Sequence, residues 1–238
     1  MTIAEVSTAA PPLDWRGDLY SHALRTGRGP LYLRRHDGWM LPLDVERWCG
    51  AVDEIDGLVV NRCRGAVLDI GCGPGRFAAA LRRRRHRVLG IDVSPVAVER
   101  TRDNGAPALH LSVYDRLPGE GSWDTALLMD GNIGIGGDPV ALLRRITHIT
   151  APGGLLITEV ANSNVDERLT VHVDNGAGRR GGRFAWARIG AEALARLTSD
   201  SNWRIVEHWS RDDRAFCALR SGRAQSPTAV SPDGQPLE

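Results

Sequence analysis

Residues 67–76 constrain the fold of this chain more than any other segment; they read Val-Leu-Asp-Ile-Gly-Cys-Gly-Pro-Gly-Arg. Residues 67–70 are a short apolar run with one embedded carboxylate, which is typical of a buried parallel strand. The glycines at positions 71, 73 and 75 let the backbone turn sharply and let a ligand approach it, because no Cβ atom stands in the way. The segment therefore predicts a strand that ends in a ligand-binding turn.

The chain then continues as a helix and a second strand. Residues 77–85 favour a helix, and the N–H groups of its first turn would face whatever lies over the glycines. Residues 88–91 are a second apolar run, and Asp92 at its end is placed to accept hydrogen bonds from two ribose hydroxyls. A glycine-rich turn alone is a weak signal, but these five features in this order predict a nucleotide-type ligand.

This arrangement resembles motif I and the acidic loop of class I S-adenosylmethionine-dependent methyltransferases, and the resemblance covers roughly residues 62–220. Residues 123–129 match the family's fourth strand, residues 142–150 match the helix before its fifth strand, and residues 151–157 match the turn into that strand. Residues 203–209 and 214–219 match the two last strands. The resemblance implies an α/β fold: a doubly wound, mainly parallel seven-stranded sheet of the Rossmann-like methyltransferase type. Strands and helices alternate from residue 66 onward, as such a sheet requires.

The chain divides into four parts. Residues 1–12 and 221–238 are rich in Ala, Pro, Ser and Gly, and we expect frayed tails there. Residues 13–62 predict an N-terminal helical cap over the ligand site. Residues 63–220 predict the S-adenosylmethionine-binding methyltransferase domain.

Two parts of this plan carry predicted local structure of their own. In the cap, we expect one helix near residues 15–26 and another near residues 42–62, with Asp44 at or near the N-cap of the second. Residues 162–190 contain two runs of alternating apolar and polar residues around a turn rich in glycine and arginine. They predict a β-hairpin, inserted after the fifth strand at the acceptor site.

Composition narrows the function classes. The chain has 238 residues, which suits one sizeable α/β domain, and a formal net charge of +1, which gives no reason to expect a nucleic-acid or membrane partner. All thirty basic residues are arginine. Schiff-base chemistry, P-loop phosphate binding and the Tyr-Lys pair of many hydride-transfer enzymes need the lysine that is missing here.

The cysteines and the chain start favour a cytoplasmic protein. The four cysteines are scattered without metal-ligand spacing, so we expect no metal site, and free thiols suit a reducing compartment. Residues 1–12 lack the basic start and apolar stretch of a signal peptide. No apolar run approaches the ~20 residues that a membrane helix needs.

The resemblance also implies the residues that hold S-adenosylmethionine. Asp69 could line the methionyl end or equally be a structural carboxylate that pins the glycine loop. Val113 and Asp115 are expected near the adenine, although Asp115 could be a plain turn residue. The full set of expected cofactor-binding residues is Asp69, Gly71, Cys72, Gly73, Asp92, Val93, Val113, Asp115, Asp130 and Gly131.

Because the methyl donor is already activated, an enzyme of this kind mainly has to align the nucleophile with it and exclude water, and it depends less on a catalytic group. The two candidate catalytic residues are His172, on the polar face of the predicted hairpin, and Asp130, at the end of the fourth strand. A lone histidine on a strand is more often structural or solvated. Weaker candidates for a general base are His36, His208 and Glu159. Four aromatic residues could build an acceptor pocket or pack the cap: Trp15, Trp39, Trp48 and Trp186.

The sequence thus predicts methyl transfer to a small molecule, with oxygen favoured over nitrogen or carbon. Asp-Gly-Asn-Ile at residues 130–133 differs from the Asn- or Asp-Pro-Pro-aromatic pattern of relatives that methylate amines of nucleic acids or glutamine. Two alternatives stay open: an NAD(P)-dependent oxidoreductase, which Asp92 and the glycines would also suit, and a non-catalytic S-adenosylmethionine-binding subunit. The acceptor and the oligomeric state, monomer or homodimer, are not determined.

Overall fold

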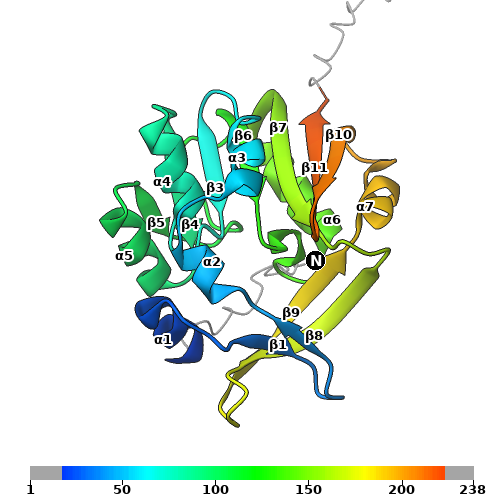
Figure 1. The fold of residues 1–238 in the computed structure, drawn as a ribbon. Coiled ribbons are helices and arrows are strands. Elements are labelled where there is room, and N and C mark those ends of the chain that lie inside the picture. The colour runs from blue at the N-terminus through cyan, green and yellow to red at the C-terminus, as the bar shows by residue number, and fades with distance from the viewer. Residues whose placement is uncertain (1–17, 223–238) are drawn as a thin grey trace, which may run out of the picture.

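The structure is a computed structural model that describes residues 18–222. At its centre is a seven-stranded sheet with the order β10-β11-β7-β6-β3-β4-β5 (Figure 1). The strands are β3 (Val67–Ile70), β4 (Val88–Asp92), β5 (Ala108–His110), β6 (Trp123–Leu128), β7 (Thr150–Val160), β10 (Trp203–Arg211) and β11 (Arg214–Ser221). Six of these strands point in one direction, and β11 runs antiparallel to them between β10 and β7. The predicted mainly parallel, seven-stranded sheet is confirmed.

Helices cover both faces of this sheet, so its strands are buried on both sides. Leu68 and Ile70 of β3 belong to one apolar cluster, whereas Val67 belongs to another. The first cluster includes side chains of α6 (Pro139–Ile149) and α7 (Ala191–Thr198), and the second includes those of α3 (Glu54–Val60) and α4 (Arg76–Arg83). α5 (Pro95–Asp103) connects β4 to β5.

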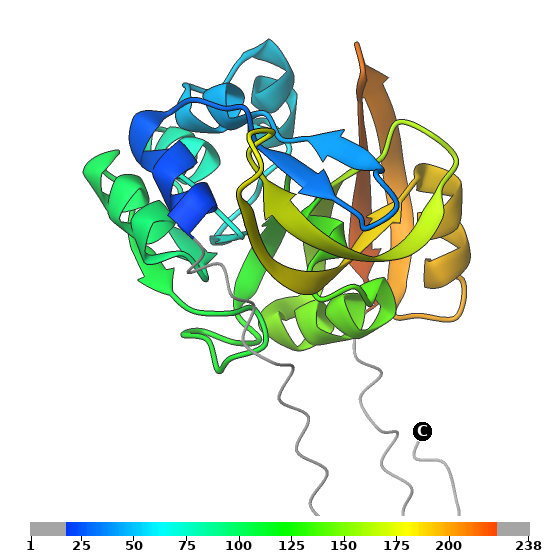
Figure 2. The same cartoon turned by 90° about the horizontal axis from the view of Figure 1, so that it is seen from below.

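A second, four-stranded antiparallel sheet lies beside the central one and has the order β2-β1-β8-β9. β8 (Asp166–Asp174) and β9 (Arg180–Ile189) are the predicted hairpin, which is confirmed. β1 (Tyr32–Arg34) and β2 (Met40–Pro42) are two short strands of the cap that the sequence analysis did not predict. Figure 2 shows these cap strands, in blue, beside the olive strands of the hairpin.

The helices of the cap differ from the expected pair. α1 (Asp18–Thr26) matches the first, whose expected residues 15–17 lie outside the described residues, as does the tail 1–12. The single helix expected over residues 42–62 is wrong, because the chain forms α2 (Val45–Cys49) and α3 instead. Gly50 is extended and ends α2, and the Asp53 carboxylate then caps α3 by accepting a hydrogen bond from the Asp56 N–H at 2.7 Å.

The break in this helix has a packing reason. Val45 of α2 packs in the cluster formed by the cap and the hairpin, whereas Val59 of α3 packs against the central sheet. One straight helix would present both valines to the same surface, and here they serve two different cores. The predicted N-cap of α2 is confirmed: the Asp44 Oδ1 accepts a hydrogen bond from the Arg47 N–H at 3.2 Å.

Candidate active site

Three adjoining cavities lie along the C-terminal edge of the parallel strands, under the cap and the hairpin. The first runs from the ends of β3 and β4 to the segment after β5, and Asp92 and Val113 line it. The second lies over the glycine turn and includes Gly73. The third, with a volume of about 380 Å³, lies between the cap strands, the ends of β6 and β7, and β9. Trp186 of β9 lines all three cavities, which therefore adjoin one another at this side chain.

Asp92 anchors the glycine turn from the end of β4. Its Oδ2 accepts a hydrogen bond from the Gly73 N–H at 2.9 Å, and its Oδ1 accepts one from the Ser94 N–H at 2.8 Å. Burial raises the pKa of Asp92 to about 6, against the lowering effect of these two N–H groups. Each carboxylate oxygen keeps a free lone pair, so the group can still accept hydrogen bonds from ligand hydroxyls in the first cavity.

The glycine turn opens toward the second cavity at one position. A Cβ atom on Gly71 would lie 2.6 Å from the Asn132 Nδ2, so the Gly71 side of the turn is closely packed. A Cβ atom on Gly73 would meet only the Tyr20 hydroxyl, at 3.9 Å. Both glycines have positive φ, +67° and +54°. The turn therefore exposes its backbone to a ligand at Gly73.

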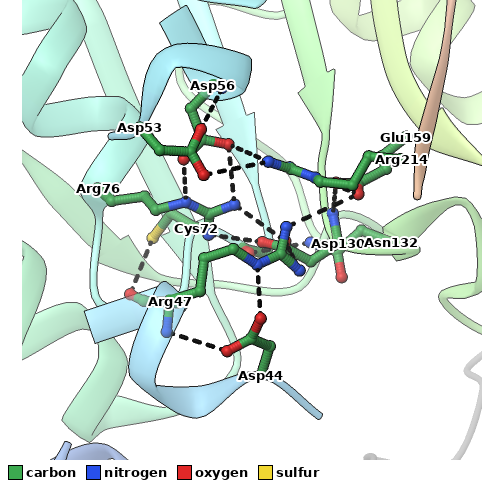
Figure 3. Close-up of polar contacts among 12 residues, drawn as sticks. Asp44, Arg47, Asp53, Asp56, Cys72, Arg76, Asp130, Asn132, Glu159 and Arg214 are labelled. Atoms are coloured by element: carbon green, nitrogen blue, oxygen red, sulfur yellow. Dashed lines mark hydrogen bonds and ion pairs between the residues drawn. The ribbon is translucent and has the colours of Figure 1, made fainter. Parts of the chain in front are cut away.

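Figure 3 shows a network of arginines and carboxylates, and several of its members line the second and third cavities. Arg76, the last residue of the glycine motif, donates to both oxygens of Asp130 at 2.7 and 2.9 Å. It also donates from Nε to Asp56 at 2.8 Å. Asp130 has a φ of +55°, an uncommon conformation for a residue with a side chain, at the turn that follows β6. This turn directs the Asp130 carboxylate to the first turn of α4.

The same network continues to the end of β7. Arg214 donates to both oxygens of Glu159, at 2.8 and 2.9 Å, and from Nη1 to Asp56 at 2.8 Å. The Glu159 Oε2 also accepts a hydrogen bond from the Asp130 N–H at 2.9 Å. Burial alone would raise the pKa of Asp56, but Arg76 and Arg214 outweigh it, and the pKa lies below its usual value. Asp56 is therefore an ionised carboxylate between two arginines.

The structure brings most of the predicted cofactor residues to the cavities. Val93 lines the first cavity with Asp92 and Val113, and Cys72 lines the second with Gly71, Gly73 and Asp130. Gly131 lines the third cavity. Asp115 lines none of the three; its Oδ2 accepts a hydrogen bond from the Ser112 N–H at 2.8 Å and holds the turn after β5. The binding roles of these residues stay predictions.

Asp69 lies beneath the glycine turn and lines none of the three cavities. It is buried, and its Oδ2 has no hydrogen-bond partner among residues 18–222. Burial raises the pKa of Asp69 to about 7, and the neighbouring carboxylates of Asp130 and Asp92 add to the rise while Arg76 opposes it. This placement favours the structural reading of Asp69.

The raised pKa gives a testable linkage between pH and stability. The folded protein binds a proton at Asp69 at pH values where the unfolded chain has lost it, so the Asp69 contribution becomes less favourable as pH rises through about 7. We expect Asp69→Asn to gain stability relative to the wild type by about 1 kcal/mol between pH 6 and pH 8. Urea unfolding of both proteins without cofactor at the two pH values measures this. A stability difference that does not change with pH would contradict it.

The two candidate catalytic residues are placed differently. Asp130 lies at the second and third cavities, but both of its oxygens accept hydrogen bonds from Arg76. His172 lines none of the three cavities. On β8 its neighbours Val171 and Val173 belong to the cluster under the hairpin, so His172 points from the opposite face of the strand, near Asp174. The structure therefore does not bring the His172 ring to Asp130.

Three of the lining residues that sequence reasoning missed are Asn132, Tyr20 and Arg76. Asn132 donates from Nδ2 to the carbonyl oxygens of Ile70 and Gly71, both at 3.0 Å, and so holds the glycine turn. Tyr20 of α1 lines the first and second cavities, and Arg76 lines the second. Asn132 follows directly after the predicted Asp130 and Gly131, which was the available signal. Nothing in the local pattern around Tyr20 distinguished it from a packing residue.

These features fit S-adenosylmethionine. The first cavity, with Asp92 between the strand ends and the apolar side chains of Leu111 and Val113, suits an adenosine. The open Gly73 backbone beside Arg76 and Asp130 suits a methionyl group, which carries one charge of each sign. Among residues 18–222, no group of three or more His, Cys, Asp or Glu side chains is placed to hold a metal ion. None of the described helices is long and apolar enough to cross a membrane.

Comparison with known proteins identifies the family. Residues 45–208 match the family described as "Methyltransferase domain", which is more than half of the chain. This protein belongs to that family, the class I S-adenosylmethionine-dependent methyltransferases. Membership of this family makes S-adenosylmethionine the methyl donor that the site is expected to bind.

The sequence relatives match only part of this chain. The chain is 35% identical over 140 residues to the ribosomal protein L11 methyltransferase of Pseudomonas paraeruginosa, covering 54% of this chain and 45% of that protein. It is 29% identical over 138 residues to the ubiquinone biosynthesis O-methyltransferase of Xanthomonas oryzae pv. oryzae, covering 55% and 51%. The chain thus spans about half the length of the curated relatives that it matches.

Solved structures share the fold at low sequence identity. An S-adenosylmethionine-dependent methyltransferase from Bacteroides fragilis, in complex with S-adenosyl-L-homocysteine, has a TM-score of 0.73 at 18% identity and covers 90% of this chain and 97% of its own. The 1,6-didemethyltoxoflavin-N1-methyltransferase of Burkholderia thailandensis has a TM-score of 0.59 at 18% identity, covering 91% and 92%. At these identities the likeness supports the fold alone.

Proposed function

We propose that this protein is an enzyme that transfers the methyl group of S-adenosylmethionine to a small-molecule acceptor. Oxygen is favoured over nitrogen or carbon as the acceptor atom. The observation that carries the proposal is the third cavity, which adjoins the second cavity at Trp48, Asp130 and Trp186 and is covered by the cap strands and β9. Its volume of about 380 Å³ suits a compact molecule.

The relatives support this proposal in part. One matched relative is named an O-methyltransferase of ubiquinone biosynthesis, and the Burkholderia structure contains a bound small heterocycle. The L11 methyltransferases make a protein acceptor the main competing proposal. The family membership argues against the nicotinamide-dependent oxidoreductase. Turnover separates an enzyme from the non-catalytic subunit. A cytoplasmic location stays part of the proposal, since all four cysteines are free thiols.

Turnover with matched acceptor classes tests the proposal. The enzyme is incubated with S-adenosylmethionine and, separately, phenols, small amines, purified ribosomal protein and RNA, and S-adenosylhomocysteine is measured as the product. We expect product above the acceptor-free background with hydroxylated small molecules. Methylation of the protein or RNA alone would contradict the proposal.

The ribose assignment of Asp92 has its own test. We expect Asp92→Ala to weaken S-adenosylhomocysteine binding by roughly 1.5–3 kcal/mol, because hydrogen bonds to a charged group are lost. Isothermal titration measures the affinity. Glu99→Ala on the exposed side of α5 is the matched control, since it removes one carboxylate without touching a cavity. An affinity equal to that of the control would show that Asp92 does not hold the ribose.

A further inference from the structure

The network of arginines and carboxylates contains Arg47, Arg76 and Arg214. Of these three arginines, Arg47 of α2 lines the third cavity. Arg76 and Arg214 each use Nε, Nη1 and Nη2 in hydrogen bonds to carboxylates. Arg47 makes one side-chain hydrogen bond among the described residues, from Nε to the Asp44 Oδ2 at 3.0 Å. Its Nη1 has no hydrogen-bond partner there. Arg47 therefore lines the cavity with a guanidinium group whose buried Nη1 has no hydrogen-bond partner among the described residues.

The neighbouring carboxylates do not provide this Nη1 with a hydrogen-bond partner. The Arg47 Nη2 lies 3.2 Å from the Asp130 Oδ1, and Nη1 lies 3.9 Å from the Glu159 Oε1, as ion pairs without hydrogen-bond geometry. Asp130 is already held at both oxygens by Arg76, and Glu159 by Arg214. Figure 3 shows Arg47 in contact with these groups from the side of α2. An additional oxygen acceptor would complete its hydrogen bonding.

No side chain that lines the third cavity is a suitable proton acceptor. Among the described residues, its titratable lining groups are Asp44, Arg47, Asp130, Glu159 and Arg188, and this lining contains no histidine, cysteine or tyrosine. Asp130 and Glu159 are fixed by bidentate arginines, and Asp44 caps α2 and pairs with Arg47. An acceptor that reacts here must bring an unprotonated nucleophile of its own.

The other wall of the cavity is apolar and aromatic. Trp48 and Trp186 both line the second and third cavities, where the cofactor and acceptor spaces meet. Trp186 is seated on the turn after β6, because a Cβ atom on Gly134 would lie 2.8 Å from its indole ring. The remaining apolar lining includes Leu33, Leu41, Leu43 and Ile133. Indole faces favour flat ring compounds.

Building on the proposed methyl transfer to a small molecule, we propose that the acceptor is a planar ring compound with an acidic hydroxyl, a phenol or an enol, that binds as its oxyanion. Its ring lies against Trp48 and Trp186, and Arg47 supplies the countercharge. The oxyanion's lone pair forms the new O–CH₃ bond, the S–CH₃ bond breaks with its electrons going to sulfur, and no proton has to leave. Arg47 is thus a positioning and specificity residue.

The test measures binding to the full chain saturated with S-adenosylhomocysteine. Two ionisable probes, 4-nitrophenol and 7-hydroxycoumarin, are compared by calorimetry at pH 8 with the non-ionising 4-nitrobenzyl alcohol and coumarin. We expect each ionised probe to bind at least about tenfold more tightly than its partner. The absorbance of each bound probe should be that of its anion.

Variants at Arg47 and Trp186 test the charged and the aromatic wall of the third cavity separately. Arg47→Gln should reduce the preference for the ionised probe to near unity while S-adenosylhomocysteine still binds, whereas Trp186→Ala should weaken both members of a pair alike. Arg62→Gln is the control, because Arg62 pairs with Glu207 and lines none of the three cavities. Absence of probe binding, or equal binding within each wild-type pair, overturns the oxyanion proposal and leaves the methyltransferase assignment intact. Failure to bind S-adenosylhomocysteine would instead remove the basis of both.

Discussion

Gly73→Val is expected to abolish cofactor binding while the protein stays folded. The Cβ position of Gly73 faces the open second cavity, with only the Tyr20 hydroxyl at 3.9 Å, so the new side chain would fill ligand space and displace little protein. The positive φ of +54° adds backbone strain of about 1–3 kcal/mol, which lowers stability without preventing folding. Isothermal titration with S-adenosylhomocysteine and thermal unfolding measure the two effects separately.

A matched control isolates the steric effect from the strain. Gly105 also has a positive φ, +84°, and a Cβ atom there would meet nothing within 4 Å, but it lies after α5 and lines none of the cavities. Gly105→Val should lose similar stability and bind the cofactor normally. Normal binding by Gly73→Val would show that the cofactor does not pass over this turn.

Asp56→Ala is expected to destabilise the protein by about 3–5 kcal/mol, because removal of one member of a buried ion network leaves uncompensated charge. Asp56 is fully buried and is the carboxylate shared by Arg76 and Arg214. Without it, the two guanidinium groups keep Asp130 and Glu159 but face each other across the vacated position. Urea unfolding gives the free energy of unfolding of the variant and the wild type.

Glu54→Ala is the control for this substitution. Glu54 has the same charge type, lies on the same helix α3 and is exposed, so its removal should change the free energy of unfolding by less than about 0.5 kcal/mol. A loss of less than about 1 kcal/mol for Asp56→Ala would show that the network contributes little to the folded state.

The central sheet was predictable because its signals are local. The apolar runs of β3 and β4, the glycine turn between β3 and α4, and Asp92 all lie within one continuous segment. The hairpin was likewise visible in the alternation of its own residues. The cap strands were not, since β1 is three residues long and pairs with β8, far away in the sequence. The register of that pairing, Leu33 opposite Val173, leaves no trace in either segment alone.

The candidate site was predictable only where it belongs to the family motif. Asp92, Gly73 and Val113 follow from the resemblance, and the structure brings them to two adjoining cavities. The network of arginines and carboxylates was not predictable from the sequence, because its members come from α2, α3, α4 and the ends of three strands. In the sequence, Asp56 and Arg47 look like ordinary polar residues on an amphipathic helix. Their separate places in the network, Arg47 beside Asp130 and Asp56 between Arg76 and Arg214, depend on the break at Gly50, which the helical periodicity concealed.

Isothermal titration of the full chain with S-adenosylmethionine and S-adenosylhomocysteine, beside NADH, tests the central claim most directly. The geometry of Asp92, the glycine turn and the three cavities predicts saturable binding of both sulfur compounds at one site per chain and no binding of NADH. Asp92→Ala should weaken both titrations together. Binding of NADH, with no measurable heat from either sulfur compound, would contradict the account.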